Sequence, residues 1–145
     1  MTLTVGIGSF GTIGRQVARE LDQGNIPGLS LGLVSAQNLE RAAERMADFA
    51  TPVPVVSLGD LAQCDVVLEA APAAVFAEIA DNAVATYSVF IPTSHATMMP
   101  RMTLQEQVQA TPARICCPHS AFLGLYAYRS APDVVITYVS TLPHN

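Results

Sequence analysis

Short runs of Val, Ile and Leu alternate along this chain with segments in which apolar residues recur every three to four positions. Short apolar runs rich in β-branched residues are typical of buried strands, whereas the three-to-four spacing is typical of amphipathic helices. The pattern predicts strands over residues 3–8, 29–34, 53–56, 65–69, 88–91 and 114–117, and a last strand over 133–140. It predicts helices over 11–23, 39–49, 73–85, 103–110 and 121–130, and a short one that ends at 63.

The most informative segment joins the first predicted strand to the first predicted helix. It reads Gly6-Ile-Gly-Ser-Phe-Gly-Thr-Ile-Gly14. Small residues let the backbone approach a pyrophosphate closely, and the free N–H groups and dipole of a helix N-terminus attract its negative charge. The segment therefore predicts a dinucleotide phosphate site. The alternative is an ordinary glycine-rich turn that binds no ligand.

The glycine pattern of such sites fits this segment in two registers. The first uses Gly6, Gly8 and Gly11, which matches the pattern literally. It leaves a short strand, however, and it places Arg15 where the helix must pack closely against the sheet.

The second register uses Ser9, Gly11 and Gly14, with Ala18 one turn further along the helix. We prefer it because it lengthens the strand and places small residues where helix and sheet cross. Gly11 would then face the pyrophosphate and Gly14 would lie at the crossing of helix and strand. The weakness of this register is Ser9, since the tight turn must tolerate a β-carbon.

The alternation of strands and helices predicts the class of fold. Strands joined by helical crossovers are typical of parallel sheets with helices on both faces. We predict a single α/β domain over residues 1–145, a doubly wound and mostly parallel sheet of the Rossmann NAD(P)-binding type.

Composition narrows the classes of partner. The chain is 50% hydrophobic and 13% charged, with a mean hydropathy of +0.35, which argues against disorder and favours a partner that covers apolar surface. The net charge is −5 and the seven basic residues, all Arg, are scattered, so we expect no nucleic acid partner. No apolar run reaches the ~20 residues of a membrane span. Three cysteines without metal-ligand spacing predict a cytoplasmic protein with no disulfide framework and no metal site.

The end of the second predicted strand bears on the choice between NAD and NADP. NAD-specific sites carry an acidic residue there for the ribose 2′-OH, but residues 34–38 hold no carboxylate. Ser35 and Asn38 can hydrogen-bond a ribose, and Arg41 could reach a 2′-phosphate. This favours NADP and leaves NAD open; alternatively, Ser35 and Asn38 only cap the next helix.

Four segments resemble the N-terminal domain of bacterial L-aspartate dehydrogenase-like proteins: residues 9–14, 26–31, 67–76 and 118–125. The resemblance implies an NAD(P)-dependent oxidoreductase that interconverts aspartate and iminoaspartate. It places the pyrophosphate over residues 10–13 and the nicotinamide beside residues 70–72. The expected cofactor-binding residues are Gly8, Ser9, Phe10, Gly11, Thr12, Ile13, Gly14, Ser35, Asn38, Ala70, Ala71 and Pro72.

The chain also departs from that family. The loops at 94–97 and 118–121 each lack a family glycine, and members continue into a second domain that carries the catalytic histidine. We therefore predict no catalytic residue here, and cofactor binding without turnover by this chain alone. A non-enzymatic NAD(P)-binding module or partner subunit, or a decayed paralogue, are the alternatives. Loss of the second domain would expose part of the sheet, which predicts a homodimer.

The remaining chemically active side chains are assigned structural roles. Glu69 ends a core strand, where we expect it to cap or hold structure rather than to act in catalysis. Cys116 and Cys117 are expected to be buried, inert thiols. Loop or surface positions are expected for His95, His119, His144, Arg101, Arg114 and Arg129.

Overall fold

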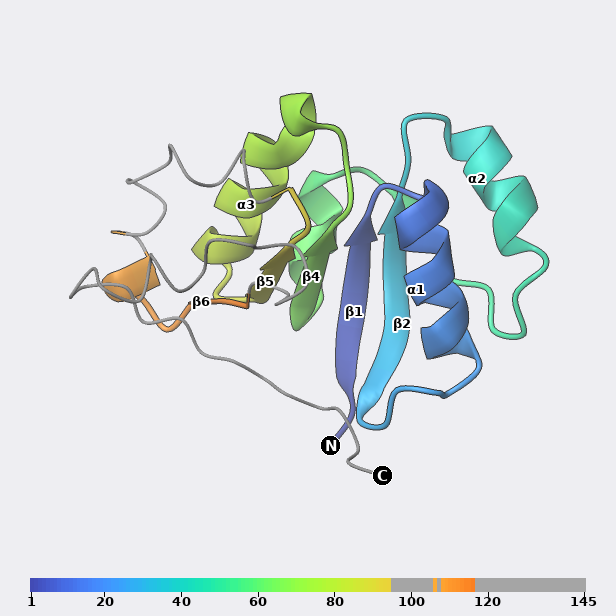
Figure 1. The fold of residues 1–145 in the computed structure, drawn as a ribbon, viewed down its shortest axis with the longest axis horizontal. Coiled ribbons are helices and arrows are strands. Elements are labelled where there is room, and N and C mark those ends of the chain that lie inside the picture. The colour runs from blue at the N-terminus through green and yellow to red at the C-terminus, as the bar shows by residue number, and fades with distance from the viewer. Residues whose placement is uncertain (95–105, 107, 117–145) are drawn as a thin grey trace.

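The computed structural model describes residues 1–94, 106 and 108–116. Within this part of the chain all the strands are parallel and lie in one sheet, in the order β3-β2-β1-β4-β5-β6 (Figure 1). The chain builds outward from β1 on one side, then crosses back to place β4 on the other side. This confirms the doubly wound parallel sheet. The strands are β1 (Leu3–Gly8), β2 (Leu29–Ser35), β3 (Val55–Val56), β4 (Val66–Glu69), β5 (Val89–Pro92) and β6 (Arg114–Ile115).

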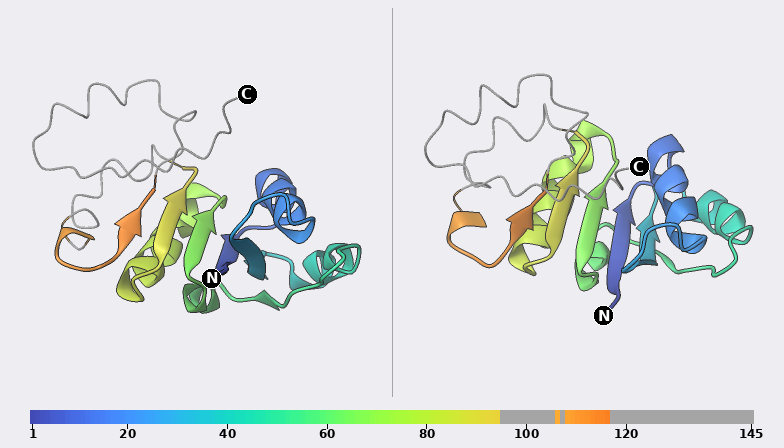
Figure 2. Two further views of the ribbon diagram at one scale, coloured as in Figure 1. Left: turned by 90° about the horizontal axis from the view of Figure 1, so that it is seen from below. Right: turned by 60° about the horizontal axis from the view of Figure 1, so that its bottom comes forward.

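Helices cover both faces of the sheet, and α1 and α3 lie on opposite sides of the row of strands (Figure 2). Alternate residues of β4 explain the two layers: Val66 and Leu68 join one buried cluster, whereas Val67 joins the other. The helices are α1 (Thr12–Asp22), α2 (Leu39–Met46) and α3 (Phe76–Ala85), with short 3₁₀ turns η1 (Gly59–Gln63) and η2 (Ala73–Val75).

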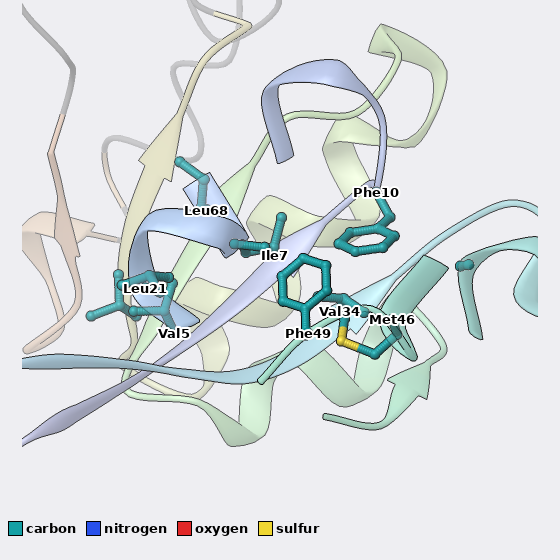
Figure 3. Close-up of a cluster of buried hydrophobic side chains, with 11 residues drawn as sticks. Val5, Ile7, Phe10, Leu21, Val34, Met46, Phe49 and Leu68 are labelled. Carbon is teal, nitrogen blue, oxygen red and sulfur yellow. The ribbon is translucent and has the colours of Figure 1, made fainter. Parts of the chain in front are cut away.

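The first cluster fills the space between the sheet and helices α1 and α2 (Figure 3). At its centre the ring of Phe10, just after β1, lies 5.7 Å from the ring of Phe49, just after α2. Arg19 of α1 lies over the same Phe49 ring, with its guanidinium carbon 5.6 Å from the centroid. These contacts tie the turn after β1 to the segment after α2.

The second cluster lies between the sheet and α3, and here β1 contributes only glycine. A β-carbon at Gly8 would come within 2.9 Å of Ile79 Cδ1, and one at Gly6 within 3.3 Å of Leu61 Cδ2. The missing side chains let α3 and η1 approach the central strand. Phe76 and Phe90 close this layer with an edge-to-face contact at 5.7 Å.

Several elements are shorter than the sequence pattern predicts. The second helix ends at Met46 rather than 49, because Phe49 turns inward onto Phe10 and Asp22 accepts the N–H groups of Ala50 and Thr51, each at 2.8 Å. The third and sixth strands each have two residues, and the helix predicted over 73–85 begins as the 3₁₀ turn η2. The helix predicted over 121–130, the last strand and half of the helix over 103–110 lie outside the described residues.

Candidate dinucleotide site

The strand order reverses between β1 and β4, and the carboxyl ends of these two strands lie side by side. Gly8 is the register partner of Glu69, and the N–H of Ala70 donates to the Gly8 carbonyl oxygen at 3.0 Å. In open α/β sheets ligands bind at such a switch point, outside the carboxyl ends of the strands. The predicted phosphate turn and the predicted nicotinamide loop therefore start from adjacent strand ends.

The turn after β1 does tolerate a β-carbon at the position where glycine is usual. Ser9 has φ +92°, in the left-handed region that favours glycine. Its N–H donates to the carbonyl oxygen of Ser35 at 3.1 Å, which joins the turn to the end of β2. Surrounding structure thus holds Ser9 in a strained conformation.

Gly14 lies where α1 crosses the turn. A β-carbon there would overlap the Ser9 carbonyl oxygen and come within 3.0 Å of Ile7 Cγ2. The structure therefore confirms the packing position that the second register predicts for Gly14. It also explains why Ala18, one turn further along and fully buried, is small.

Gly11, by contrast, faces open space. A β-carbon there would meet only Ser9 Oγ, at 3.5 Å. Gly11 is also the N-cap of α1; no side chain caps this helix, and its first turn holds no acidic residue. The N–H groups of the first turn are thus available to an anion. Ile13 in the same turn is 55% exposed, a large apolar side chain beside the open backbone.

Phe10 has a different role from the other residues of this turn. Its side chain is only 4% exposed and packs in the first cluster, so it anchors the turn in the core. A cofactor contact by Phe10 would come from its backbone. Gly11 and Thr12 are exposed in the same turn.

At the end of β2, the structure shows Asn38 capping the next helix, which was one of the two roles that the sequence allowed for it. Asn38 is the N-cap of α2, and its Oδ1 accepts the N–H of Arg41 at 2.9 Å. Ser35 is 2% exposed. Ribose contacts by Ser35 and Asn38 therefore stay predictions.

Three arginines from α1 and α2 lie near one another on this side of the site. Desolvation of Arg45, followed by the positive charges of Arg41 and Arg15, lowers the pKa of the Arg45 guanidinium. The same two helices also carry Glu20, Asp22, Glu40 and Glu44, so this side of the molecule is of mixed charge.

On the other side of the switch point, a buried carboxylate joins two loops. Glu69 is 0% exposed. Its Oε1 accepts the N–H of Ala71 at 2.8 Å and the hydroxyl of Ser94 at 3.0 Å. Its Oε2 accepts the N–H groups of Thr93 at 3.2 Å and Ser94 at 3.0 Å. These bonds confirm the structural role expected for Glu69. The feature of the sequence that indicated this role was a carboxylate at the end of an apolar strand.

The predicted nicotinamide loop begins directly after Glu69. Ala70 is half-buried, Ala71 is buried and Pro72 is exposed. The Ser94 hydroxyl also lies 3.4 Å from the Ala71 carbonyl oxygen. Two loops from different crossovers therefore meet at one place on the carboxyl edge of the sheet.

Other candidate groups show no site in the described ranges. No cluster of three or more His, Cys, Asp or Glu could hold a metal ion there, and none of the helices there is long and apolar enough to cross a membrane. Cys116 is only partly buried, which corrects the prediction of a buried thiol, because it lies just after β6, the last strand of the sheet. Desolvation still raises the pKa of the Cys116 thiol, as it does for the buried Cys64, which fits unreactive cysteines. Outside the described residues lie His95, His119, His144, Cys117, Arg101 and Arg129.

A parallel sheet of this order, a glycine turn at its switch point and an uncapped helix facing that turn define a dinucleotide-binding α/β domain. The model of the homoserine dehydrogenase NAD-binding domain family matches residues 10–118. The chain belongs to this family of NAD-binding domains.

Two relatives are L-aspartate dehydrogenases. L-aspartate dehydrogenase 3 of Bordetella bronchiseptica (strain ATCC BAA-588 / NCTC 13252 / RB50) is 30% identical over 132 residues, which cover 90% of this chain and 48% of that protein. L-aspartate dehydrogenase of Bradyrhizobium diazoefficiens is 30% identical over 132 residues, covering 89% of this chain and 46% of that protein. The resemblance to aspartate dehydrogenase-like proteins is confirmed, and the chain spans about half the length of these relatives.

Solved structures agree on the fold. Myo-inositol dehydrogenase of Lactobacillus casei, in complex with NAD(H) and myo-inositol, superposes with a TM-score of 0.68 at 17% identity, covering 88% of this chain and 40% of that one. Scyllo-inositol dehydrogenase of the same species, with bound NAD(H) and scyllo-inositol, gives a TM-score of 0.67 at 13% identity and covers 89% and 40%. At these identities the likeness concerns the fold alone.

Proposed function

We propose that this chain binds a nicotinamide dinucleotide at the turn between β1 and α1, as the cofactor domain of an amino-acid dehydrogenase. The observation that best supports this proposal is the contrast between the surroundings of two glycines. Gly14 has no room for a β-carbon, whereas Gly11 has open space beside an uncapped helix end. The backbone of residues 11–13 would hold the pyrophosphate, and the bound cofactor would accept or donate hydride.

Titration calorimetry with NADH and NADPH tests this proposal. We expect micromolar binding that is lost in Gly11→Glu, because the new carboxylate would compete with the phosphates for the helix end. The fold should survive, since a β-carbon at Gly11 meets only Ser9 Oγ. Gly59→Glu adds the same charge at a position where a β-carbon meets only Asn82 Nδ2, at 3.8 Å, and should bind normally. No binding by the unmodified chain would contradict the proposal.

We further propose that the site prefers NADP. Support comes from the lack of a carboxylate at residues 34–38 and from Arg41, which follows the N-cap of α2 at the end of β2 and whose charge, with that of Arg15, helps lower the pKa of Arg45. Guanidinium groups suit a 2′-phosphate. Arg41→Ala should weaken NADPH binding by about tenfold and leave NADH binding unchanged. Arg114→Ala, on β6 at the far edge of the sheet, is the control. Equal loss for both cofactors would contradict the preference.

The substrate class is proposed from the relatives. Because two L-aspartate dehydrogenases are 30% identical to this chain, we propose hydride exchange with L-aspartate or a similar amino acid. Residues 1–145 alone should show no turnover, since no catalytic group is assigned among them. NADP⁺ reduction by the isolated chain with L-aspartate would contradict this expectation. If the chain is instead a binding module without catalysis, a longer protein that contains these residues would also show no turnover.

We also propose that residues 1–145 form one domain, that the chain is a cytoplasmic protein and that it is a homodimer. Three cysteines without a predicted disulfide framework support the compartment, and the mean hydropathy of +0.35 supports self-association. Sedimentation velocity at several concentrations tests the dimer. A single species at 15.3 kDa throughout would contradict it.

A further inference from the structure

The carboxylate of Glu69 draws together backbone from two separate crossovers. It accepts the N–H of Ala71 from the loop after β4, and the N–H groups of Thr93 and Ser94 from the segment after β5. The Ser94 hydroxyl adds a fourth donor, at 3.0 Å. All four donors come from loops at the carboxyl edge of the sheet.

Burial of the Glu69 carboxylate costs free energy, and the packing of β4 does not explain why a carboxylate is present. A carboxylate at 0% exposure has lost its hydration, and only good hydrogen bonds compensate for that loss. An apolar residue would continue the run Val66-Val67-Leu68 without this cost. The strand below therefore does not need the carboxylate, whereas the N–H groups of Ala71 and Ser94 do. The Thr93 N–H is shared, since it also donates to the main-chain carbonyl oxygen of Glu69 at 3.0 Å.

The position of Glu69 relative to the phosphate turn indicates what these loops serve. Its register partner is Gly8, the last residue before the glycine turn. A dinucleotide that lies across the switch point, with its phosphates at Gly11 and its adenosine half on the β2 side, extends its other half over the ends of β4 and β5. The loops that Glu69 holds are therefore those beneath the nicotinamide ring.

We infer that Glu69 is a positioning residue for the nicotinamide half of the cofactor, acting through the backbone of Ala71, Thr93 and Ser94. This rests on the proposed function. Glu69 does not itself need to touch the cofactor. Its side chain joins two loops that belong to different crossovers, in addition to the main-chain bond from the Thr93 N–H to the Glu69 carbonyl oxygen at 3.0 Å.

The test compares two ligands that differ in the nicotinamide ring. ADP-ribose retains the adenosine, the pyrophosphate and the second ribose, whereas NADH adds the ring that the loops are inferred to position. Glu69→Gln keeps the size of the side chain but replaces one acceptor oxygen with a donor that faces backbone N–H groups. We expect NADH affinity of the full 145-residue chain to fall by about tenfold or more. ADP-ribose affinity should stay within about twofold.

Two further variants make the comparison specific. Ser94→Ala removes one of the four donors and retains the backbone contacts, so its loss of NADH affinity should be smaller, in the same direction and again without loss for ADP-ribose. It also carries the test if Glu69→Gln does not fold. Glu78→Gln makes the same chemical change on an exposed residue of α3 and should alter neither affinity.

The outcomes separate the inference from the proposed function. An equal loss for both ligands would mean that Glu69 does not act through the nicotinamide ring, and no loss for either would mean that the loops do not contact that ring. Either result overturns the inference while cofactor binding stands. If the unmodified chain binds neither ADP-ribose nor NADH, the proposed function fails, and the inference fails with it.

Discussion

The carbonyl oxygen of Ser9 occupies the space that a β-carbon on Gly14 would need. The first residue of the turn and the third residue of α1 are thereby packed backbone to backbone. This contact sets how closely α1 approaches β1, and it directs the N-terminus of α1 toward the switch point.

Gly14→Ala should therefore destabilise the domain. The added methyl group must push α1 away from the turn, and overpacking of this kind costs about 1–3 kcal/mol. Gly11→Ala is the matched control, because its β-carbon meets only Ser9 Oγ at 3.5 Å and its backbone is already extended. Denaturant unfolding measures both variants. Equal stability of the two would show that the register of the turn is misassigned.

Ser9→Gly should stabilise the domain. The φ of +92° costs a serine about 1–3 kcal/mol, whereas the extra freedom of glycine in the unfolded chain costs about 0.5–1 kcal/mol. The strain is at least as large, so we expect a net gain of about 0–2.5 kcal/mol. Ser30→Gly, in the part of β2 that pairs in register with Thr4, should lose stability instead. A loss at both positions would mean that Ser9 makes contacts worth more than its strain.

Asp65 should contribute to the acid sensitivity of the fold. Its carboxylate accepts the N–H and the hydroxyl of Thr4, each at 2.8 Å, and the N–H bond from Thr4 is the main cause that lowers the pKa of Asp65 below its usual 3.8. A lowered pKa in the folded state favours folding above pH 3.8. That contribution is lost as the pH falls from 3.8 through the folded-state pKa.

Unfolding of Asp65→Asn between pH 2 and 7 measures this contribution. We expect the variant to be less stable at pH 7 and to lose less stability than the unmodified chain on acidification. Asp48→Asn, an exposed aspartate after α2, should follow the unmodified curve. Parallel curves for Asp65→Asn and the unmodified chain would exclude the linkage.

Cys64 should resist alkylation in the folded protein. It is 5% exposed, its Sγ lies within 3.2 Å of where β-carbons on Gly6 and Gly32 would be, and burial raises the pKa of its thiol. A raised pKa leaves less thiolate at pH 7.5, and the thiolate is the reactive form. Peptide mass spectrometry after iodoacetamide treatment should find Cys64 unlabelled in the native state and labelled in denaturant. Rapid native labelling would contradict this packing.

Some parts of the site could be predicted because they depend on local sequence. The spacing of Gly11, Gly14 and Ala18 at the start of one helix predicts that Gly14 and Ala18 face the sheet and that Gly11 faces a ligand. In the structure Gly14 packs against the turn and Ala18 is buried, as predicted. The early end of α2 could not be predicted in this way. It depends on Phe49 meeting Phe10 and on Asp22 reaching Ala50, which are contacts between distant parts of the chain.

The sequence by itself determined the order and type of most elements, the class of fold and the position of the glycine turn after β1. Periodicity and turn residues report which side of each element is apolar and where it ends, and those are properties of neighbouring residues. Only the tertiary structure decided that Glu69 lies beside Gly8 and holds Thr93 and Ser94. The physical reason is that strand order and loop contacts arise when separate crossovers pack on one sheet, and local periodicity does not encode which strand ends become neighbours.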